Sequence, residues 1–239
     1  MSQLEIDAVV FDVLGTLVDE PAGIRNGIRE LDPSLDNLSV ERLLSLWQQH
    51  IEREQRRILD GGRPYVTSDA LDQEAARLVA DAAGVGVGDP AAVAALARSG
   101  RRLPPWPDTV TGLARLAERH PLIGLSNASR TALLEVNAHA GLRWHQALSA
   151  EDARTYKPDP AVYQLAVRVS GRPPERLLMV ATHAWDLRAA QTLGLRTAYV
   201  TRPVGDPPTT TDRFDLYADD LDDLADQLDK AGPARPGLP

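Results

Sequence analysis

The order of strand-like and helix-like segments restricts the fold of this chain more than any other feature. A β-branched, apolar run covers residues 6–13 and ends just before Gly15. Three further strand patterns come much later, at residues 122–126, 176–181 and 197–200. Helical periodicity alternates with them, at residues 108–119, 129–140, 159–170 and 185–193. This alternation predicts an α/β fold, with a doubly wound, mostly parallel sheet and helices on both faces.

The long segment between the first and second strands is helical. In its first half, apolar residues recur every three or four positions, as on one face of a helix. They are Val40, Leu43, Leu44, Trp47, Ile51 and Ile58. Ser39 is the expected N-cap of this helix, and Gly61 ends it. A second helix is expected over residues 68–83. A third follows Asp89, with Pro90 at its first position, where a missing N–H costs nothing.

These patterns divide the chain into two expected units. We interpret residues 20–102 as a helical cap inserted after the first strand, and residues 1–19 together with 103–232 as a Rossmann-like core. The Pro-, Gly- and Thr-rich segment 202–213 is expected to be a loop ahead of a short last strand. The tail, residues 233–239, is too poor in apolar residues to order itself, and we expect it to be disordered.

Charge and composition limit the kinds of partner. The 239-residue chain carries a formal net charge of −8 at pH 7, which disfavours nucleic acids and anionic membrane surfaces because both attract cationic faces. It contains no cysteine, which excludes thiol nucleophiles and thiolate zinc sites. The acidic start of the chain does not resemble a signal peptide, and no apolar run reaches about 18 residues. We therefore expect a cytoplasmic protein that acts on a small molecule.

Polar side chains stand where the predicted strands end. In open α/β sheets, ligands bind beyond the carboxyl ends of the strands, so these side chains are candidates for a shared site. They are Asp12 and Thr16, Ser126 and Asn127, Lys157, and Asp186. Each alone has an ordinary alternative, since such residues commonly cap helices or form turns. Their order along the chain carries more information than any single one of them.

Four segments resemble, in sequence and in order, the four motifs of the haloacid dehalogenase superfamily. They read FDVLGTLVD, LSNAS, YKPDPAVY and VATHAWDLRAA. The resemblance implies that Asp12 is a nucleophile, supported by Thr16, Ser126, Lys157 and Asp186. A carboxylate with a pKa of about 3.9 is ionised at neutral pH, and a nearby ammonium keeps it so. Lys157 is therefore the expected counterion of Asp12.

Two residues favour the dehalogenase branch of this superfamily over its phosphatases. The phosphatases need an acid two positions after the nucleophile, but this chain has Leu14, which cannot protonate a leaving alkoxide. They also hold Mg²⁺ with acids of the fourth motif, where this chain has Thr182. A halide leaves without protonation, so both absences suit displacement at carbon. We expect no metal and no other cofactor.

Neighbours of these motifs resemble the type II L-2-haloacid dehalogenases. They are Asn127, Tyr163 and Trp185. The resemblance implies that Ser126 and backbone N–H groups after Asp12 hold the substrate carboxylate. It also implies that Asn127 and Trp185 surround the departing halide, and that Asp186 orients or deprotonates the water that hydrolyses the ester.

Several positions depart from those dehalogenases. Leu14 replaces a Tyr, Gln48 replaces the Arg that binds the halide, and Ala181 and His183 replace a Ser and an Asn. A neutral amide loses a charge-assisted hydrogen bond to an anion, worth about 1.5–3 kcal/mol. We keep Leu14 and Gln48 as substrate-binding candidates. His183 is a catalytic candidate, because an imidazole can hold or deprotonate the hydrolytic water near neutral pH.

The sequence thus predicts hydrolytic dehalogenation of a small 2-haloalkanoic acid through an ester on Asp12. A second hypothesis keeps the displacement but changes the leaving group, as in the related azetidine-carboxylate hydrolases, which would not need a halide-binding Arg. A phosphatase of the superfamily and a noncatalytic binding module are weaker alternatives. The sequence leaves the substrate, its stereochemistry and the oligomeric state open, with a homodimer as one expectation.

Overall fold

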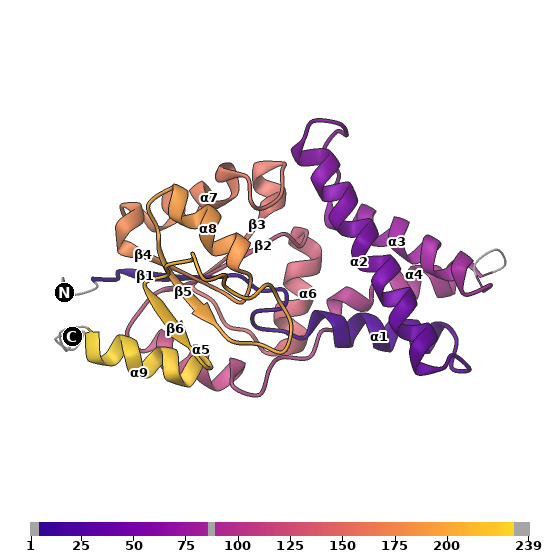
Figure 1. Ribbon diagram of the computed structural model, residues 1–239, viewed down its shortest axis with the longest axis horizontal. Helices are drawn as coiled ribbons and strands as arrows, with labels where there is room; N and C mark the ends of the chain where they lie inside the picture. Colours follow the sequence, from indigo (N-terminus) through magenta and orange to yellow (C-terminus); the bar gives the residue numbers. More distant parts are fainter. Residues whose placement is uncertain (1–4, 86–88, 232–239) are drawn as a thin grey trace.

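The computed structural model describes residues 5–85 and 89–231. Over these residues it contains one sheet of six parallel strands (Figure 1), in the order β3-β2-β1-β4-β5-β6. The strands are β1 (Ala8–Phe11), β2 (Leu122–Ser126), β3 (Gln146–Ser149), β4 (Leu177–Ala181), β5 (Arg196–Val200) and β6 (Leu216–Ala218). β1 is buried and lies between β2 and β4. The predicted α/β fold is confirmed, with a sheet that is wholly rather than mostly parallel.

Helices cover both faces of the sheet, as a doubly wound fold requires. One face carries α5 (Thr109–Ala117), α6 (Arg130–Ala140) and α9 (Leu221–Ala231). The other carries α7 (Pro160–Ser170) and α8 (Ala184–Thr192), as Figure 1 shows. Alternate residues of a strand point to opposite faces, so Val10 packs under α7 and α8 while Phe11 packs on the opposite side. The two apolar layers fix the carboxyl ends of the central strands.

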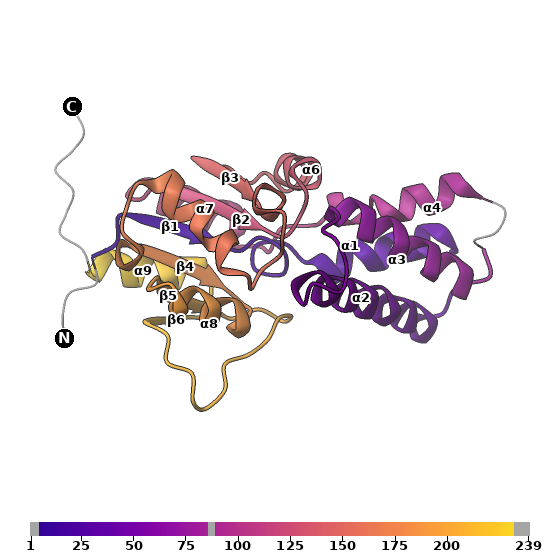
Figure 2. The ribbon, with the colours of Figure 1, turned by 90° about the horizontal axis from the view of Figure 1, so that it is seen from above.

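A separate group of helices lies beyond the carboxyl ends of the strands (Figure 2). It consists of α1 (Glu20–Leu31), α2 (Asn37–Leu59), α3 (Ser68–Ala82) and α4 (Pro90–Ala97). Their apolar faces pack on one another, around Ile28, Val40 and Trp47. All of them come from the segment between β1 and β2, as predicted. We keep the division into a cap (20–102) and a core (1–19 and 103–232) as an interpretation, and the tail at 233–239 lies outside the described residues.

The expected N-cap of the long helix, Ser39, was wrong. Asp36 takes this position, and its side chain accepts a hydrogen bond from the backbone N–H of Ser39 at 2.7 Å. An aspartate caps as well as a serine does, and its charge also suits the helix N-terminus. The resulting α2 has 23 residues but one polar face, and no helix in the described part of the chain is long and apolar enough to cross a membrane.

Two elements were missed by the sequence analysis. β3 is an edge strand whose first residues, Gln146 and Ala147, are exposed, so it lacks the apolar run that marks a buried strand. α9 is rich in aspartate, but its buried Leu221, Leu224 and Leu228 recur at helical spacing and pack on the sheet. The leucine spacing was a signal that could have identified this helix.

A network of charged side chains ties α2 to α3. The buried Glu54 accepts hydrogen bonds from Arg63 at 2.8 Å, from Arg57 at 3.0 Å and from Arg53 at 3.2 Å. Arg63 also binds Glu74 on α3, at 2.6 Å. Burial alone would raise the pKa of Glu54, but the surrounding arginines lower it from 4.5 to about 2. Glu54 is therefore held ionised, as the anionic centre of the network.

Replacing Glu54 with glutamine is expected to lower the free energy of unfolding by about 1–3 kcal/mol at neutral pH, because three guanidinium groups lose their anionic partner. The depressed pKa means that this contribution is present above pH 4.5 and lost as the pH falls towards about 2. Urea unfolding at several pH values measures it. Glu52→Gln is the control, since Glu52 forms only an exposed pair with Arg56 on the same helix. Equal stability of both variants at pH 7 would contradict the prediction.

Candidate active site

β1 ends in a tight loop that carries the predicted nucleophile. The backbone N–H of Asp12 donates to the carbonyl of Val180 on β4 at 3.0 Å, so strand pairing continues to this residue. Gly15 has a φ of +79°, a left-handed conformation in which a side chain is strained. A Cβ at this position would also lie 2.8 Å from Nε2 of His183. The glycine therefore lets the loop after Asp12 approach the fourth motif closely.

Lys157 joins the nucleophile loop to the start of α8 by two buried ion pairs. Its Nζ donates to Oδ1 of Asp12 at 2.9 Å and to Oδ2 of Asp186 at 2.8 Å. The second oxygen of Asp12 accepts a hydrogen bond from the hydroxyl of Thr16 at 2.7 Å. The second oxygen of Asp186 accepts one from the hydroxyl of Tyr163 at 2.5 Å. Four predicted catalytic residues, all buried, thus belong to one hydrogen-bonded network.

The charges of this network determine which of its groups are ionised. Burial alone would lower the pKa of Lys157, but the carboxylates of Asp12 and Asp186 raise it above its ordinary value, so the ammonium keeps its charge at neutral pH. Burial raises the pKa of Asp186, while Lys157 acts in the opposite direction. Burial and the charge of Asp186 also raise the pKa of Tyr163, whose hydroxyl therefore keeps its proton. The network holds Asp12 in one orientation with a cation beside it.

The end of β2 brings Ser126 and Asn127 to the same edge of the sheet. Ser126 is fully buried, and its Oγ accepts a hydrogen bond from the N–H of Ala128 at 3.1 Å. Oδ1 of Asn127 accepts one from the backbone N–H of Lys157 at 2.8 Å. This second bond links the second motif to the third. It leaves the amide nitrogen of Asn127 without a partner among the described residues, and that nitrogen can donate to a ligand.

The turn from β4 into α8 contributes His183 and Trp185. Nε2 of His183 lies 3.3 Å from the carbonyl oxygen of Leu14, so the imidazole packs directly against the nucleophile loop. The two aromatic rings of His183 and Trp185 stand 5.7 Å apart. The backbone N–H of Trp185 is fixed by the carboxylate of Asp206, at 3.1 Å. His183 of the fourth motif therefore contacts the nucleophile loop, and Trp185 packs beside His183.

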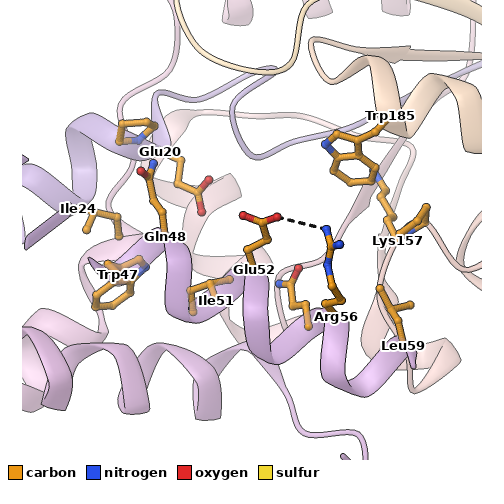
Figure 3. Close-up of a pocket in the computed structure, with 13 residues that line it drawn as sticks. Glu20, Ile24, Trp47, Gln48, Ile51, Glu52, Arg56, Leu59, Lys157 and Trp185 are labelled. Carbon is orange, nitrogen blue, oxygen red and sulfur yellow. Dashed lines mark hydrogen bonds and ion pairs between the residues drawn. The ribbon is translucent and has the colours of Figure 1, made fainter. Parts of the chain in front are cut away.

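A pocket of about 460 Å³ separates this edge of the sheet from the helices α1 and α2. In Figure 3, Lys157 and Trp185 stand on one side of it, and Glu20 and Gln48 on the other. An exposed ion pair between Glu52 and Arg56 borders it as well. The pocket is the size of a small-molecule site.

A smaller chamber of about 50 Å³ lies next to the large pocket. The two spaces share Glu20, Trp47 and three other lining residues. Leu14 and Asn127 line the chamber on the side of the sheet, and Asp72 of α3 lines it on the side of the helices. A ligand that enters the pocket can therefore place a compact group between α3 and the nucleophile loop.

The structure brings the predicted site residues to one place. Asp12, Thr16, Lys157 and Asp186 are in direct contact. The remaining candidates surround this network or line the two spaces beside it. They are Leu14, Gln48, Ser126, Asn127, His183 and Trp185. The expected placement of the motifs at the carboxyl edge of the sheet is thus what the fold produces.

Several polar residues at this place were not assigned to the site by the sequence analysis, and three of them bear on its chemistry. They are Glu20, Asp72 and Tyr163. Tyr163 belongs to a motif-like segment, and this was a usable signal. Glu20 and Asp72 lie on helices whose orientation follows from packing against other helices, so nothing in the local sequence distinguishes them from solvated acids.

Comparison with known proteins agrees with this geometry. The model of a family of hydrolases, the haloacid dehalogenase-like hydrolases, matches residues 6–194. The chain belongs to the haloacid dehalogenase-like hydrolases. An (S)-2-haloacid dehalogenase of Pseudomonas putida is 30% identical to it over 204 residues, which cover 84% of this chain and 86% of that protein.

Solved structures of this family are similar over almost the whole length. One L-2-haloacid dehalogenase superposes with a TM-score of 0.85 at 34% identity, covering 94% of this chain and 99% of that one. The L-2-haloacid dehalogenase of Xanthobacter autotrophicus with chloropropionic acid covalently bound has a TM-score of 0.83 at 25% identity. That comparison covers 95% of this chain and all of the other. The cap-like helices are therefore part of the shared architecture.

The residues present do not fit the Mg²⁺ site of the phosphatases in this superfamily. Leu14 offers no oxygen ligand, and the hydroxyl of Thr182 donates to the carbonyl of Val204 at 3.2 Å. Within residues 5–85 and 89–231, no group of three or more acidic or histidine side chains could hold a metal ion. A hard cation such as Mg²⁺ needs several oxygen ligands. We therefore derive no step through a metal.

Proposed function

We propose that this hydrolase removes halide from a small 2-haloalkanoic acid, preferably the (S)-enantiomer, through an ester formed on Asp12. The observation that carries the proposal is the Asp12–Lys157–Asp186 network beside a pocket of small-molecule size. The names of the relatives, and the covalently bound chloropropionic acid in one of them, support the same chemistry.

In the first step, a carboxylate oxygen of Asp12 attacks the carbon that bears the halogen. The new C–O bond forms as the C–halogen bond breaks, and the halide leaves with the bonding electrons, which inverts the configuration at that carbon. Lys157 keeps the nucleophile ionised and oriented. Ser126 and backbone N–H groups after Asp12 bind the substrate carboxylate, so that the reacting carbon lies in line.

In the second step, water attacks the ester carbonyl of Asp12. Asp186 orients this water or accepts its proton, and the ammonium of Lys157 stabilises the negative charge that develops on the carbonyl oxygen. His183, which lies against the nucleophile loop, helps to hold the water. The ester C–O bond to the acyl carbon then breaks, releasing a 2-hydroxy acid and restoring the Asp12 carboxylate with one oxygen from water.

The departing group is bound by neutral donors in this proposal. The free amide nitrogen of Asn127, the side chain of Gln48 and the indole of Trp185 line the two spaces and contact the halide. A neutral Gln48 binds an anion less strongly than an arginine would. This feature keeps the second hypothesis open, in which the same displacement opens a strained ring by cleavage of a C–N bond.

The test is a single-turnover reaction with (S)-2-chloropropionate in ¹⁸O-labelled water, with enzyme in excess. We expect one chloride per molecule of substrate, and one heavy oxygen in the Asp12-containing peptide of each enzyme molecule that has reacted, measured by mass spectrometry. Label found only in the 2-hydroxy acid would exclude the ester. Absence of chloride release, from chloroacetate and bromoacetate as well, would exclude the dehalogenase and leave the ring-opening reaction to be tested.

A further inference from the structure

Two carboxyl groups at the active site form no salt bridge and no hydrogen bond through their side chains within the described residues. Glu20, at the start of α1, lines both the pocket and the chamber, and Asp72 of α3 lines the chamber. The other charged residues of these two spaces are paired. Lys157 binds two aspartates, and Arg56 binds Glu52. The two side chains left without a partner are therefore both carboxylic acids.

The position of these two acids is unfavourable for a purely anionic substrate. Burial raises the pKa of Glu20, and the charge of Asp12 raises it further, while His183 opposes them. Burial also raises the pKa of Asp72, and the nearby acids Glu20 and Asp69 raise it further, while Arg101 opposes them. A halide or a second carboxylate placed between Glu20 and Asp72 would add to their repulsion. A cation placed there would relieve it.

We propose that the preferred substrate is a carboxylic acid that carries a second, ammonium group, which binds between Glu20 and Asp72. The inference rests on the proposed function, because it assumes that the substrate carboxylate lies at Ser126 and that Asp12 attacks the neighbouring carbon. It adds the substrate class: an amino-substituted rather than a simple alkanoic acid. Glu20 and Asp72 are then residues that determine specificity.

The dimensions of the site agree with such a molecule. The Glu20 carboxylate points into the pocket (Figure 3), which is also lined, on the side of the helices, by apolar groups such as Ile24 and Trp47. These surfaces suit a methylene chain. The chamber, at about 50 Å³, can hold a group of the size of one water molecule, and an ammonium is such a group. Its three N–H donors can meet both carboxylates at once.

The decisive measurement does not require turnover. The wild-type protein is titrated calorimetrically with ω-aminoalkanoates of three to six carbons, and with unsubstituted alkanoates of the same lengths. At least one amino compound is expected to bind about tenfold or more tightly than its unsubstituted counterpart, the value of one or two charge-assisted hydrogen bonds. Glu20→Gln and Asp72→Asn are expected to remove most of this preference. Glu41→Gln, an exposed acid on α2, is expected to keep it.

Chloride release then connects the binding to the reaction. The wild type is expected to have a higher kcat/KM for an ω-amino-2-chloroalkanoate than for the 2-chloroalkanoate of equal length, with most of the difference in KM. Equal or weaker binding of every amino compound would overturn the inference. Chloride release from simple 2-chloro acids would, in that case, still support the proposed function. Tighter binding of amino compounds without any chloride release would support the cation site and overturn the dehalogenase. A preference that survives in both carboxylate variants would also overturn the inference.

Discussion

Replacing Asp12 with asparagine is expected to reduce kcat for halide release by at least about 10³-fold. The amide has the shape of the carboxylate, and its oxygen can still accept a hydrogen bond from Thr16 or Lys157. It is a very weak nucleophile, so the ester does not form. Initial-rate measurement of chloride release from (S)-2-chloropropionate provides the test, with mass spectrometry to verify that the introduced amide has not deamidated.

The matched control is Asp81→Asn, which makes the same chemical change at an exposed position on α3. It is expected to keep the wild-type rate. Asp81→Asn should unfold at the wild-type urea concentration within the error of the measurement. Asp12→Asn also removes one of the two buried carboxylates that pair with Lys157, so its urea unfolding is measured alongside its activity. If Asp12→Asn retained more than a few per cent of the activity, the nucleophile would have to be another residue.

Replacing Lys157 with methionine is expected to remove activity and also to lower the free energy of unfolding by about 3–5 kcal/mol at neutral pH. Methionine fills a similar volume but leaves Asp12 and Asp186 buried beside each other without a cation. Breaking a buried ion pair on one side is costly because the remaining charges stay desolvated. Urea unfolding and chloride release measure the two effects separately. The other lysine of the chain, the exposed Lys230, supplies the control Lys230→Met.

The pH dependence of this variant gives a sharper test. In the wild type, the raised pKa of Lys157 means that its contribution to stability is fully present below its ordinary pKa of 10.5 and is lost as the pH rises through the folded-state value. Without Lys157, the pKa of Asp186, which burial already raises, rises further in the folded state because the opposing cation is lost. The variant should therefore regain stability relative to the wild type as the pH falls from neutral towards about 4. A deficit that does not change with pH would contradict the assigned ion pairs.

The sheet and the centre of the site could be predicted because their signals are local. Asp12 follows a buried strand directly, and Asp186 begins the helix after another, so the parallel order of the strands alone brings them to one edge. Lys157 lies in a loop, but the segment YKPDPAVY, which resembles the third motif, indicated that it belongs to the site. The edge strand β3 escaped detection because its exposed residues carry no apolar pattern.

The substrate-facing side of the site could not be predicted in the same way. The orientation of Glu20 and Asp72 depends on how α1, α3 and the sheet pack together, which is information spread over many distant residues. Gln48, a substrate-binding candidate from the sequence, lines the pocket, but this position alone does not define the ligand. The glutamine at position 48 in place of an arginine indicates only that a halide binds less tightly. The acids Glu20 and Asp72, which have no salt bridge, indicate that an ammonium group binds more tightly.

The helices α1 and α2, which line the pocket opposite the sheet, are supplied by one uninterrupted stretch of chain between β1 and β2. The nucleophile, by contrast, is bound to Thr16 of its own loop and to Lys157, which in turn binds Asp186. Substitutions in the stretch between β1 and β2 can therefore change which substrate binds without changing the reacting groups. Exchange of that stretch between related enzymes is therefore a direct route to new substrate ranges. The same division lets related enzymes differ in substrate while the reaction stays the same.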